Sequence, residues 1–172
     1  MKVLGAVLAG GQSRRFGSDK ALALFAGRRL LDRAEASLRD QCDDVAIIGR
    51  GHVADWPEPG RGPLGGLAGA MLHARDHGFD AVMSCPVDSF DLPGTLRTFL
   101  QPAPAYVESQ PVIGLWPVEC LAAAQAILIC GQPASMRGFA ERIGARPVNL
   151  PIEPVNINTP RDLARLEQHH GL

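Results

Sequence analysis

The stretch that decides the fold reads Val3-Leu4-Gly5-Ala6-Val7-Leu8-Ala9, followed by Gly10-Gly11-Gln12-Ser13-Arg14-Arg15-Phe16-Gly17-Ser18-Asp19-Lys20. Its first part is a short continuous apolar run, typical of a parallel strand buried on both faces. Its second part is a basic, glycine-rich loop. Glycines let the backbone approach a ligand closely, so that successive N–H groups can point at one anion. Arginines and a lysine add donors suited to phosphate oxygens. The stretch therefore predicts a strand that ends in a phosphate-binding loop.

Two familiar phosphate-binding motifs are excluded by spacing. A Walker-type loop requires Gly-x-x-x-x-Gly-Lys-Ser/Thr, whereas here two residues separate Gly17 from Lys20 and Ala21 follows. The dinucleotide fingerprint Gly-x-Gly-x-x-Gly is also absent. A basic glycine-rich loop by itself is more often a surface turn than a catalytic element. Its position after the first strand of an α/β pattern favours the functional interpretation.

Composition limits the class of protein. A chain of 172 residues that is 46% hydrophobic is the size of one domain, so we expect a single domain over residues 1–172. The net charge of −1 gives no support for a nucleic-acid-binding or membrane-binding surface. The four cysteines show neither Cys-x-x-Cys pairs nor zinc spacing, which favours buried, reduced thiols. We expect no export signal, no transmembrane span and a cytoplasmic location.

Hydrophobic periodicity indicates alternating strands and helices. Strands are predicted over residues 3–8, 45–48, 79–84, 106–107 and 112–116, and helices over 30–39, 62–74, 119–129, 135–143 and from Pro160 onward. Proline and glycine mark residues 52–61 as a loop, and residues 156–159 are a second loop whose Thr159 caps the last helix. The first strand, helix and second strand form a βαβ unit with a parallel sheet.

An acidic residue stands where a strand of this sheet ends. The segment Cys85-Pro86-Val87-Asp88 follows the predicted strand 79–84. The carboxyl ends of parallel strands line the ligand crevice, so Asp88 and the loop after Leu8 are expected to face one cleft. A carboxylate opposite a basic loop fits Mg²⁺ on a nucleoside triphosphate, with the basic groups stabilising charge as pyrophosphate leaves. The alternative for Asp88 is helix capping, for which Asp91 is the better candidate.

Five segments in order resemble one family over nearly the full length. They are Leu8-Ala9-Gly10-Gly11-x-Ser13-x-Arg15-Phe16-Gly17-x-Asp19-Lys20, Gly62-Pro63-Leu64-Gly65-Gly66-Leu67, Cys85-Pro86-Val87-Asp88, Gly114-Leu115-Trp116-Pro117 and Asn156-Ile157-Asn158-Thr159-Pro160. The family is the molybdenum cofactor guanylyltransferases. The resemblance implies a Rossmann-like nucleotidyltransferase fold: α/β, doubly wound, with a mostly parallel sheet and helices on both faces. It also implies transfer of GMP from GTP to the terminal phosphate of molybdopterin, with release of pyrophosphate.

The resemblance also implies roles for individual residues. The N-terminal half would bind the nucleotide and the C-terminal half the acceptor. Arg15, Lys20 and Asp88 would be catalytic, with Arg15 and Lys20 at the phosphates and Asp88 on Mg²⁺. Asn156 and Asn158 would lie at the pterin side. The nucleotide would be held by Leu8, Ala9, Gly10, Gly11, Lys20, Asp55, Gly62, Pro63, Leu64 and Asp88.

Some positions depart from the family pattern. Phe16 replaces a methionine, Gly49 stands where some members carry a nucleotide-contacting asparagine, and the segment 102–111 is short. Relatives that use CTP read Leu-Ala-Ala-Gly at the first loop. Here Gly10 lacks the methyl group, which leaves room for a larger purine and favours GTP.

Alternative functions stay open at this stage. One is a transferase of the same fold that uses CTP or a sugar or polyol phosphate acceptor, and another is a non-catalytic cofactor carrier. In the favoured interpretation, contacts with molybdopterin-supplying proteins and with molybdoenzyme apoproteins or their chaperones are expected. His73 and His77 are expected on a solvated helix face, and Trp116 in the core.

Overall fold

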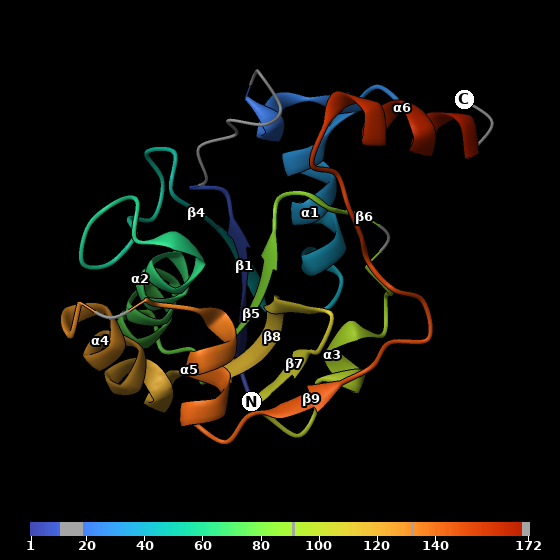
Figure 1. Ribbon diagram of the computed structural model, residues 1–172. Coiled ribbons are helices and arrows are strands. Elements are labelled where there is room, and N and C mark those ends of the chain that lie inside the picture. Colours follow the sequence, from blue (N-terminus) through green and yellow to red (C-terminus); the bar gives the residue numbers. More distant parts are fainter. Residues whose placement is uncertain (11–18, 91, 132, 170–172) are drawn as a thin grey trace.

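The computed structural model describes residues 1–10, 19–90, 92–131 and 133–169. Within these ranges, six strands form a central sheet in the order β4-β1-β5-β8-β7-β9 (Figure 1). The bounds are β4 Asp44–Ile48, β1 Val3–Leu8, β5 Ala81–Pro86, β8 Gln110–Pro117, β7 Ala105–Val107 and β9 Arg146–Val148. Only β8 among them runs antiparallel to its neighbours. The predicted mostly parallel sheet is confirmed.

Strand β1 lies at the centre of the parallel part, as its unbroken apolar sequence predicts. Val3 to Val7 are buried, and Leu8 pairs with Ile48 of β4 on one side and with Pro86 of β5 on the other. The three strands consequently end at the same level. The Ala9 N–H donates to the Ile48 carbonyl at 3.0 Å, and the Val87 N–H donates to the Leu8 carbonyl at 3.3 Å. The loops that follow β1, β4 and β5 therefore begin side by side.

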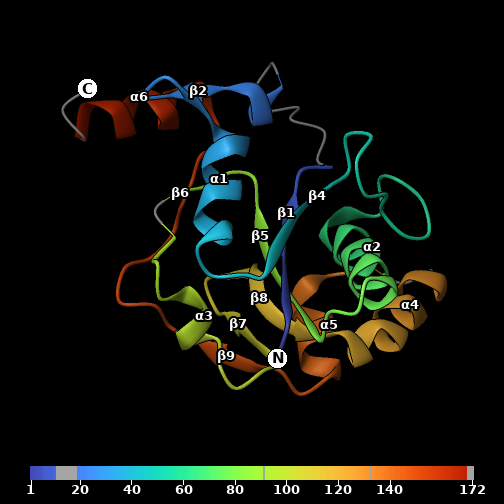
Figure 2. The same cartoon turned by 180° about the vertical axis from the view of Figure 1, so that it is seen from behind.

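Helices cover both faces of the sheet, as expected for a doubly wound fold (Figures 1 and 2). Helices α2 (Gly62–Asp76), α4 (Leu121–Ile129) and α5 (Met136–Arg142) pack on one face, with a core that includes Met71, Trp116 and Phe139. Helices α1 (Leu30–Arg39) and α3 (Leu96–Phe99) pack on the other face, around Leu38 and Leu96. Alternate residues of β1 serve the two cores, because successive strand side chains point to opposite faces.

A third, smaller cluster lies beyond the sheet, at the end where β1 and β5 finish (Figure 1). It joins the hairpin of β2 (Leu24–Phe25) and β3 (Arg28–Arg29), which follows the 3-10 helix η1 (Lys20–Leu22), to helix α6 (Pro160–His169). Its buried residues are Phe25, Leu30 and Ile157. Strand β10 (Val155–Asn156) pairs with β6 (Ser89–Phe90) and leads the chain into α6. Segments from both ends of the sequence thus meet above the sheet.

Most predicted elements are confirmed, and the differences have simple causes. The third strand covers 81–86 rather than 79–84, because pairing with β1 sets its register. The helix expected over 119–129 begins with a 3-10 turn, η2 (Val118–Cys120), and is α-helical from Leu121. Asn156, expected in a loop, lies in β10. The short elements β2, β3, β6, α3, β9 and β10 were not predicted, since two to four residues carry no recognisable period.

Two side-chain expectations are confirmed and one is partly wrong. Trp116 is fully buried, and its indole N–H donates to the Ser84 hydroxyl at 2.8 Å. The His77 ring is exposed and His73 is half-buried on the outer part of α2. All four cysteines lie in the described part of the chain and are unpaired, but only Cys85 is buried as expected: Cys42 and Cys120 are half-buried, and Cys130 is exposed at the end of α4. Burial raises the pKa of Cys42 to about 12. No helix of the described residues is long and apolar enough to cross a membrane.

Gly66 and Gly69 of α2 allow a test of how tightly this helix packs against its neighbours. A Cβ on Gly69 would collide with the Ala54 backbone oxygen, whereas one on Gly66 would make an ordinary 3.5 Å contact with Leu8. We predict that Gly69→Ala lowers the free energy of unfolding by about 1–3 kcal/mol, the usual range for overpacking. Gly66→Ala, the matched control, is expected to leave it unchanged or to raise it through better helix propensity. Urea denaturation measures both, and equal effects of the two variants would contradict this account.

Candidate active site

A cavity of about 280 Å³ opens at the carboxyl ends of β1 and β5, where the topology places a ligand crevice. Its wall is built by the strand ends, by η1, by the loop before α2 and by the first turns of α2. Most residues expected at the nucleotide lie in this wall. They are Leu8, Ala9, Gly10, Lys20, Asp55, Gly62, Pro63 and Asp88.

Three of the expected residues that the structure describes do not fall in that wall. Leu64 is fully buried beneath it, in the core below α2. Asn156 and Asn158 are exposed and lie on the β10–α6 segment, outside the cavity lining. Gly11, expected at the nucleotide, lies outside the described residues. The same holds for Arg15, expected at the phosphates, for Phe16 and for Asp91.

The start of α2 presents backbone donors to the cavity. Gly62 and Pro63 both line it, and Gly62 has a φ of +71°, which favours glycine at this turn. The N-cap residue Arg61 makes no side-chain capping hydrogen bond. The first N–H groups of a helix have no partner within the helix, and the helix dipole adds positive potential there. This 15-residue helix therefore directs an anion-binding end at the cavity.

Glycines bring the loops after β1 and β4 into close contact. Gly49 follows β4 with a φ of +87°, and a Cβ there would lie 2.8 Å from the Gly10 Cα. The absence of a side chain at Gly49 is thus a steric requirement of this packing. Gly10 is in turn covered by Asp55, since a Cβ on Gly10 would lie 3.2 Å from the Asp55 Oδ2. The three residues stack in the order Gly49, Gly10, Asp55.

The Asp55 carboxyl is held in an unfavourable environment. Its backbone is fixed against α2, where the Trp56 N–H donates to the Gly65 carbonyl at 3.0 Å. One oxygen, Oδ1, is buried and has no hydrogen-bond partner among the described residues. Burial raises the pKa of Asp55, and the Gly60 backbone N–H partly opposes this shift. A buried acceptor without a donor costs free energy, so its retention beside Gly10 points to a ligand that donates there.

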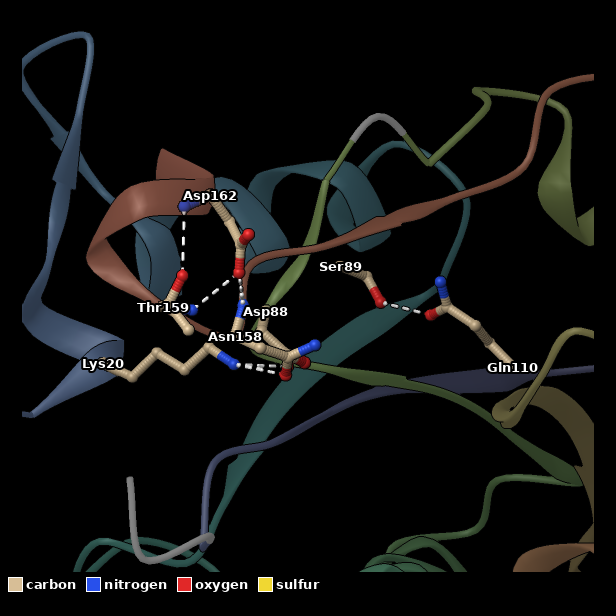
Figure 3. A network of polar contacts seen from close by, with 7 residues as sticks. All are labelled: Lys20, Asp88, Ser89, Gln110, Asn158, Thr159 and Asp162. Carbon is tan, nitrogen blue, oxygen red and sulfur yellow. Dashed lines mark hydrogen bonds and ion pairs between the residues drawn. The ribbon is translucent and has the colours of Figure 1, made fainter. Parts of the chain in front are cut away.

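Lys20 and Asp88 form an ion pair across the mouth of the cavity. The Lys20 Nζ lies 2.6 Å from the Asp88 Oδ2, and the side chains are 12% and 18% exposed. The same ammonium group donates to the Asn158 Oδ1 at 3.4 Å (Figure 3). The structure therefore brings together three of the predicted residues, from the first loop, from the end of β5 and from the segment before α6.

Asp19 and Arg50 are site residues that the sequence interpretation missed. Asp19 caps η1 by accepting the Ala21 N–H at 3.2 Å, and it pairs with Arg50, whose Nη1 lies 2.6 Å from its Oδ1. The Arg50 guanidinium lowers the pKa of Asp19 and keeps the carboxylate ionised. This pair fixes the backbone from which Lys20 extends. The only sequence signal was the position of Asp19 directly before Lys20.

The residues at Asp88 suit a magnesium ion that arrives with a nucleotide. No group of three His, Cys, Asp or Glu side chains that could hold a metal by itself occurs among the described residues. Mg²⁺ commonly uses one or two carboxylates and takes its remaining ligands from phosphates and water. A cation already neutralises Asp88 here, namely the Lys20 ammonium. The donor set thus fits the expected Mg²⁺ site with Asp88 as the protein ligand.

The segment 102–111, expected to be short for the family, contains β7 and the beginning of β8. Gln110 pairs with Val107 across a tight turn. Its side chain accepts from the Ser89 hydroxyl at 3.2 Å and donates to the Pro154 carbonyl. Figure 3 shows the contact between Ser89 and Gln110, and the contact with Pro154 ties the connection leading to β10 onto the central sheet.

Comparison with known proteins identifies the family of this chain. A family model described as the MobA-like NTP transferase domain matches residues 5–143. Proteins named molybdenum cofactor guanylyltransferase from Cereibacter sphaeroides and Acidiphilium cryptum are 35% and 36% identical to this chain. The alignments cover 97% and 94% of the chain, and 96% and 92% of those proteins.

Solved structures show the same fold. The molybdopterin-guanine dinucleotide biosynthesis protein A from Archaeoglobus fulgidus aligns with a TM-score of 0.69 at 18% identity, covering 98% of each chain. The 2-C-methyl-D-erythritol 4-phosphate cytidylyltransferase from Thermus thermophilus aligns with a TM-score of 0.71 at 16% identity, covering all of both chains. With a family model that matches most of its length and with full-length relatives, this chain belongs to the MobA-like NTP transferase family and is a nucleotidyltransferase of the molybdenum cofactor guanylyltransferase type.

Proposed function

We propose that this protein transfers GMP from GTP to the terminal phosphate of molybdopterin. An acceptor phosphate oxygen attacks the α-phosphorus of GTP, the bond from that phosphorus to the β-phosphate oxygen breaks, and pyrophosphate leaves. The names of the full-length relatives support the acceptor and the nucleotide. The single observation on the chain itself that carries the choice of base is the buried Asp55 carboxylate oxygen beside Gly10, which has no hydrogen-bond partner within the described ranges.

The Asp55 carboxylate suits guanine better than the other bases. Guanine presents its N1–H and its exocyclic N2 amino group as adjacent donors on one edge, and a carboxylate accepts two such hydrogen bonds together. Adenine places an acceptor at N1 and cytosine places one at N3, so each would put a lone pair against Asp55. Because a buried polar group left unpaired costs about 1–3 kcal/mol, the mismatch discriminates strongly.

The phosphate chemistry falls to three groups. The start of α2 and the loop after β1 hold the triphosphate through backbone donors, and Lys20 stabilises charge on it as the bond to the leaving group breaks. Bound Mg²⁺ would neutralise phosphate charge, with Asp88 as its protein ligand. Arg15 and Gly11 are proposed to complete the phosphate contacts. Nucleotide transfer of this kind depends mainly on positioning and electrostatics, so no protein nucleophile is required.

We assign acceptor binding to the C-terminal half of this single domain. Asn156 and Asn158 flank Ile157, whose N–H donates to the Asp88 backbone carbonyl at 3.1 Å. Amide side chains beside Asp88 are suited to the amide-like edges of a pterin, since an amide both donates and accepts hydrogen bonds.

We propose that the reaction takes place in the cytoplasm. We propose transient contacts with molybdopterin-supplying proteins and with molybdoenzyme apoproteins or their chaperones, because a labile cofactor is better passed directly between proteins.

A nucleotide screen tests the proposed reaction. With Mg²⁺ and molybdopterin, we expect pyrophosphate release from GTP to exceed that from ATP, CTP or UTP by at least about tenfold, the factor for one hydrogen bond to a charged group. In Asp55→Asn the preference for GTP should shrink by a similar factor, since an amide cannot accept both guanine donors. Faster turnover with CTP than with GTP would contradict the proposed guanylyltransferase activity.

The electrostatic cost of Asp55 gives a stability prediction. Because the folded-state pKa lies above the ordinary 3.8, stability falls as the pH rises from 3.8 through the raised value. Asp55→Asn, which carries no charge, should therefore unfold at a higher urea concentration than the wild type at pH 7. The difference should vanish below pH 3.8. Glu58→Gln changes an exposed carboxylate in the same loop and serves as control; a gain equal to that of Asp55→Asn would count against this explanation.

Two variants test the catalytic groups. Lys20→Ala and Asp88→Asn should each lower kcat by about 10²–10³, the range for removal of a charge-stabilising group, while the circular dichroism spectrum stays unchanged. Asp88→Asn should also lose the dependence on Mg²⁺ concentration. The chain has one other lysine, Lys2, which lies against the Phe79 ring, and Lys2→Ala is the matched control with expected wild-type activity. Wild-type-like turnover in either test variant would remove that residue from the mechanism.

A further inference from the structure

Helix α6 opens with a reciprocal set of hydrogen bonds. The Asp162 Oδ2 accepts the Thr159 backbone N–H at 2.8 Å, and the Asp162 N–H donates to the Thr159 Oγ1 at 3.2 Å (Figure 3). This is the arrangement of a capping box, in which the N-cap residue and the third helical residue satisfy each other's backbone donors. The Thr159 hydroxyl and the backbone N–H groups of Thr159 and Asn158 lower the pKa of Asp162, which keeps its carboxylate ionised.

The capping carboxylate also holds the residue before the cap. The Asp162 Oδ2 accepts the Asn158 backbone N–H at 3.0 Å, a contact that capping of the helix does not need. Asn158 is the residue whose side chain reaches Lys20. A continuous path of hydrogen bonds thus runs from Asp162 through Asn158 to Lys20, and from Lys20 to Asp88.

Packing fixes the segment from the opposite side. Ile157 is fully buried between Phe25 of the β2–β3 hairpin and Leu163 and Leu166 of α6. Strand β10 pairs with β6, directly after Asp88. The backbone on both sides of Asn158 is therefore anchored, and Asp162 supplies the contact on its C-terminal side.

We propose that Asp162 is a positioning residue for the nucleotidyl transfer. It fixes the Asn158 backbone so that the Asn158 amide oxygen holds the Lys20 ammonium at Asp88. This role rests on the proposed function, because it matters for turnover only if Lys20 acts on the phosphates. The effect on the position of Lys20 is independent of any reaction. Since a lysine side chain has many rotamers, a second acceptor beside Asp88 narrows the set that Lys20 samples.

The lysine content of the chain allows a direct test without substrate. Lys2 and Lys20 are the only two lysines. Brief acetylation of the native protein with an N-hydroxysuccinimide ester, followed by peptide mass spectrometry, gives the labelling rate of Lys20 relative to that of the exposed Lys2. In Asp162→Ala we expect this ratio to rise about fivefold, the population factor for loss of one helix cap. In Asp162→Asn, which keeps an acceptor oxygen in place, it should stay near the wild-type value.

Asp32→Ala is the matched control. Asp32 occupies the third helical position of α1, a helix of the same ten-residue length, and pairs with Arg29 at 2.8 Å. Its removal weakens a helix start without touching Asn158. A rise in Lys20 labelling equal to that of Asp162→Ala would mean general loosening and would overturn the proposal. An unchanged ratio in Asp162→Ala would overturn it too.

A double-mutant comparison separates positioning from stability. Asn158→Ala removes the side-chain contact with Lys20 and should itself raise the labelling ratio. If Asp162 acts through Asn158, then adding Asp162→Ala to this variant raises the ratio no further. Independent, multiplicative effects of the two substitutions would refute the coupling. If the Asp162→Ala variant is poorly folded, Asn158→Ala alone still tests the contact with Lys20, because it leaves the Asp162 cap in place, and an unchanged labelling ratio there would overturn the proposal.

Turnover supplies the functional readout. We expect Asp162→Ala to lower kcat by about fivefold, with Asp162→Asn restoring it, in parallel with the labelling ratio. Parallel changes support the proposal, and wild-type kcat despite raised labelling would overturn the role in catalysis. If the wild type released no pyrophosphate with any nucleotide, the proposed function would fail, whereas the labelling experiment would still decide whether Asp162 positions Lys20.

Discussion

The rest of the site depends on the parallel pairing of β1 with both β4 and β5. Leu8 lies opposite Ile48 and Pro86, so the three strands end at one level and the loops that follow them begin next to each other. Parallel strands need crossover connections, and here α1 and α2 provide them on opposite faces. The hydrophobic burial that stabilises the two cores thereby also places Gly10, Asp55 and Asp88 around one cavity.

Close approach of backbones then shapes that cavity. Gly49 and Gly10 lie against each other with no room for a Cβ, and Asp55 closes over Gly10. This packing leaves a carboxylate oxygen buried without a partner among the described residues. An unpaired acceptor lowers the stability of the protein alone, but it is ready for a ligand with suitable donors. Binding sites commonly retain such local costs because the surrounding fold is stable enough to tolerate them.

The predictability of each part of the chain follows from the length of the pattern that encodes it. Helices α1 and α2 and strands β1 and β4 have an apolar period, and their predicted bounds differ from the structure by at most two residues. The hairpin of β2 and β3, and the β6–β10 pair, consist of two-residue strands that no period reveals. Asp88 and the loop after Leu8, which leads to Lys20, were predicted to face one cleft, because both follow strands whose ends share one edge. Arg50 and Asp162 were not, since their roles arise from contacts made only after folding.

The sequence by itself determined the α/β class, the family and the chemical character of the site, because residue types, spacing and hydrophobic periodicity are local properties of the chain. Only the tertiary structure decided which of these residues meet. Lys20 contacts Asp88, 68 positions away, and Asn158, 138 positions away. It likewise decided that one Asp55 oxygen is buried with no hydrogen-bond partner in the part of the chain that the structure describes. Such contacts depend on how helices and strands pack in space, and a side chain's burial and partners are set by neighbours that its own segment does not contain.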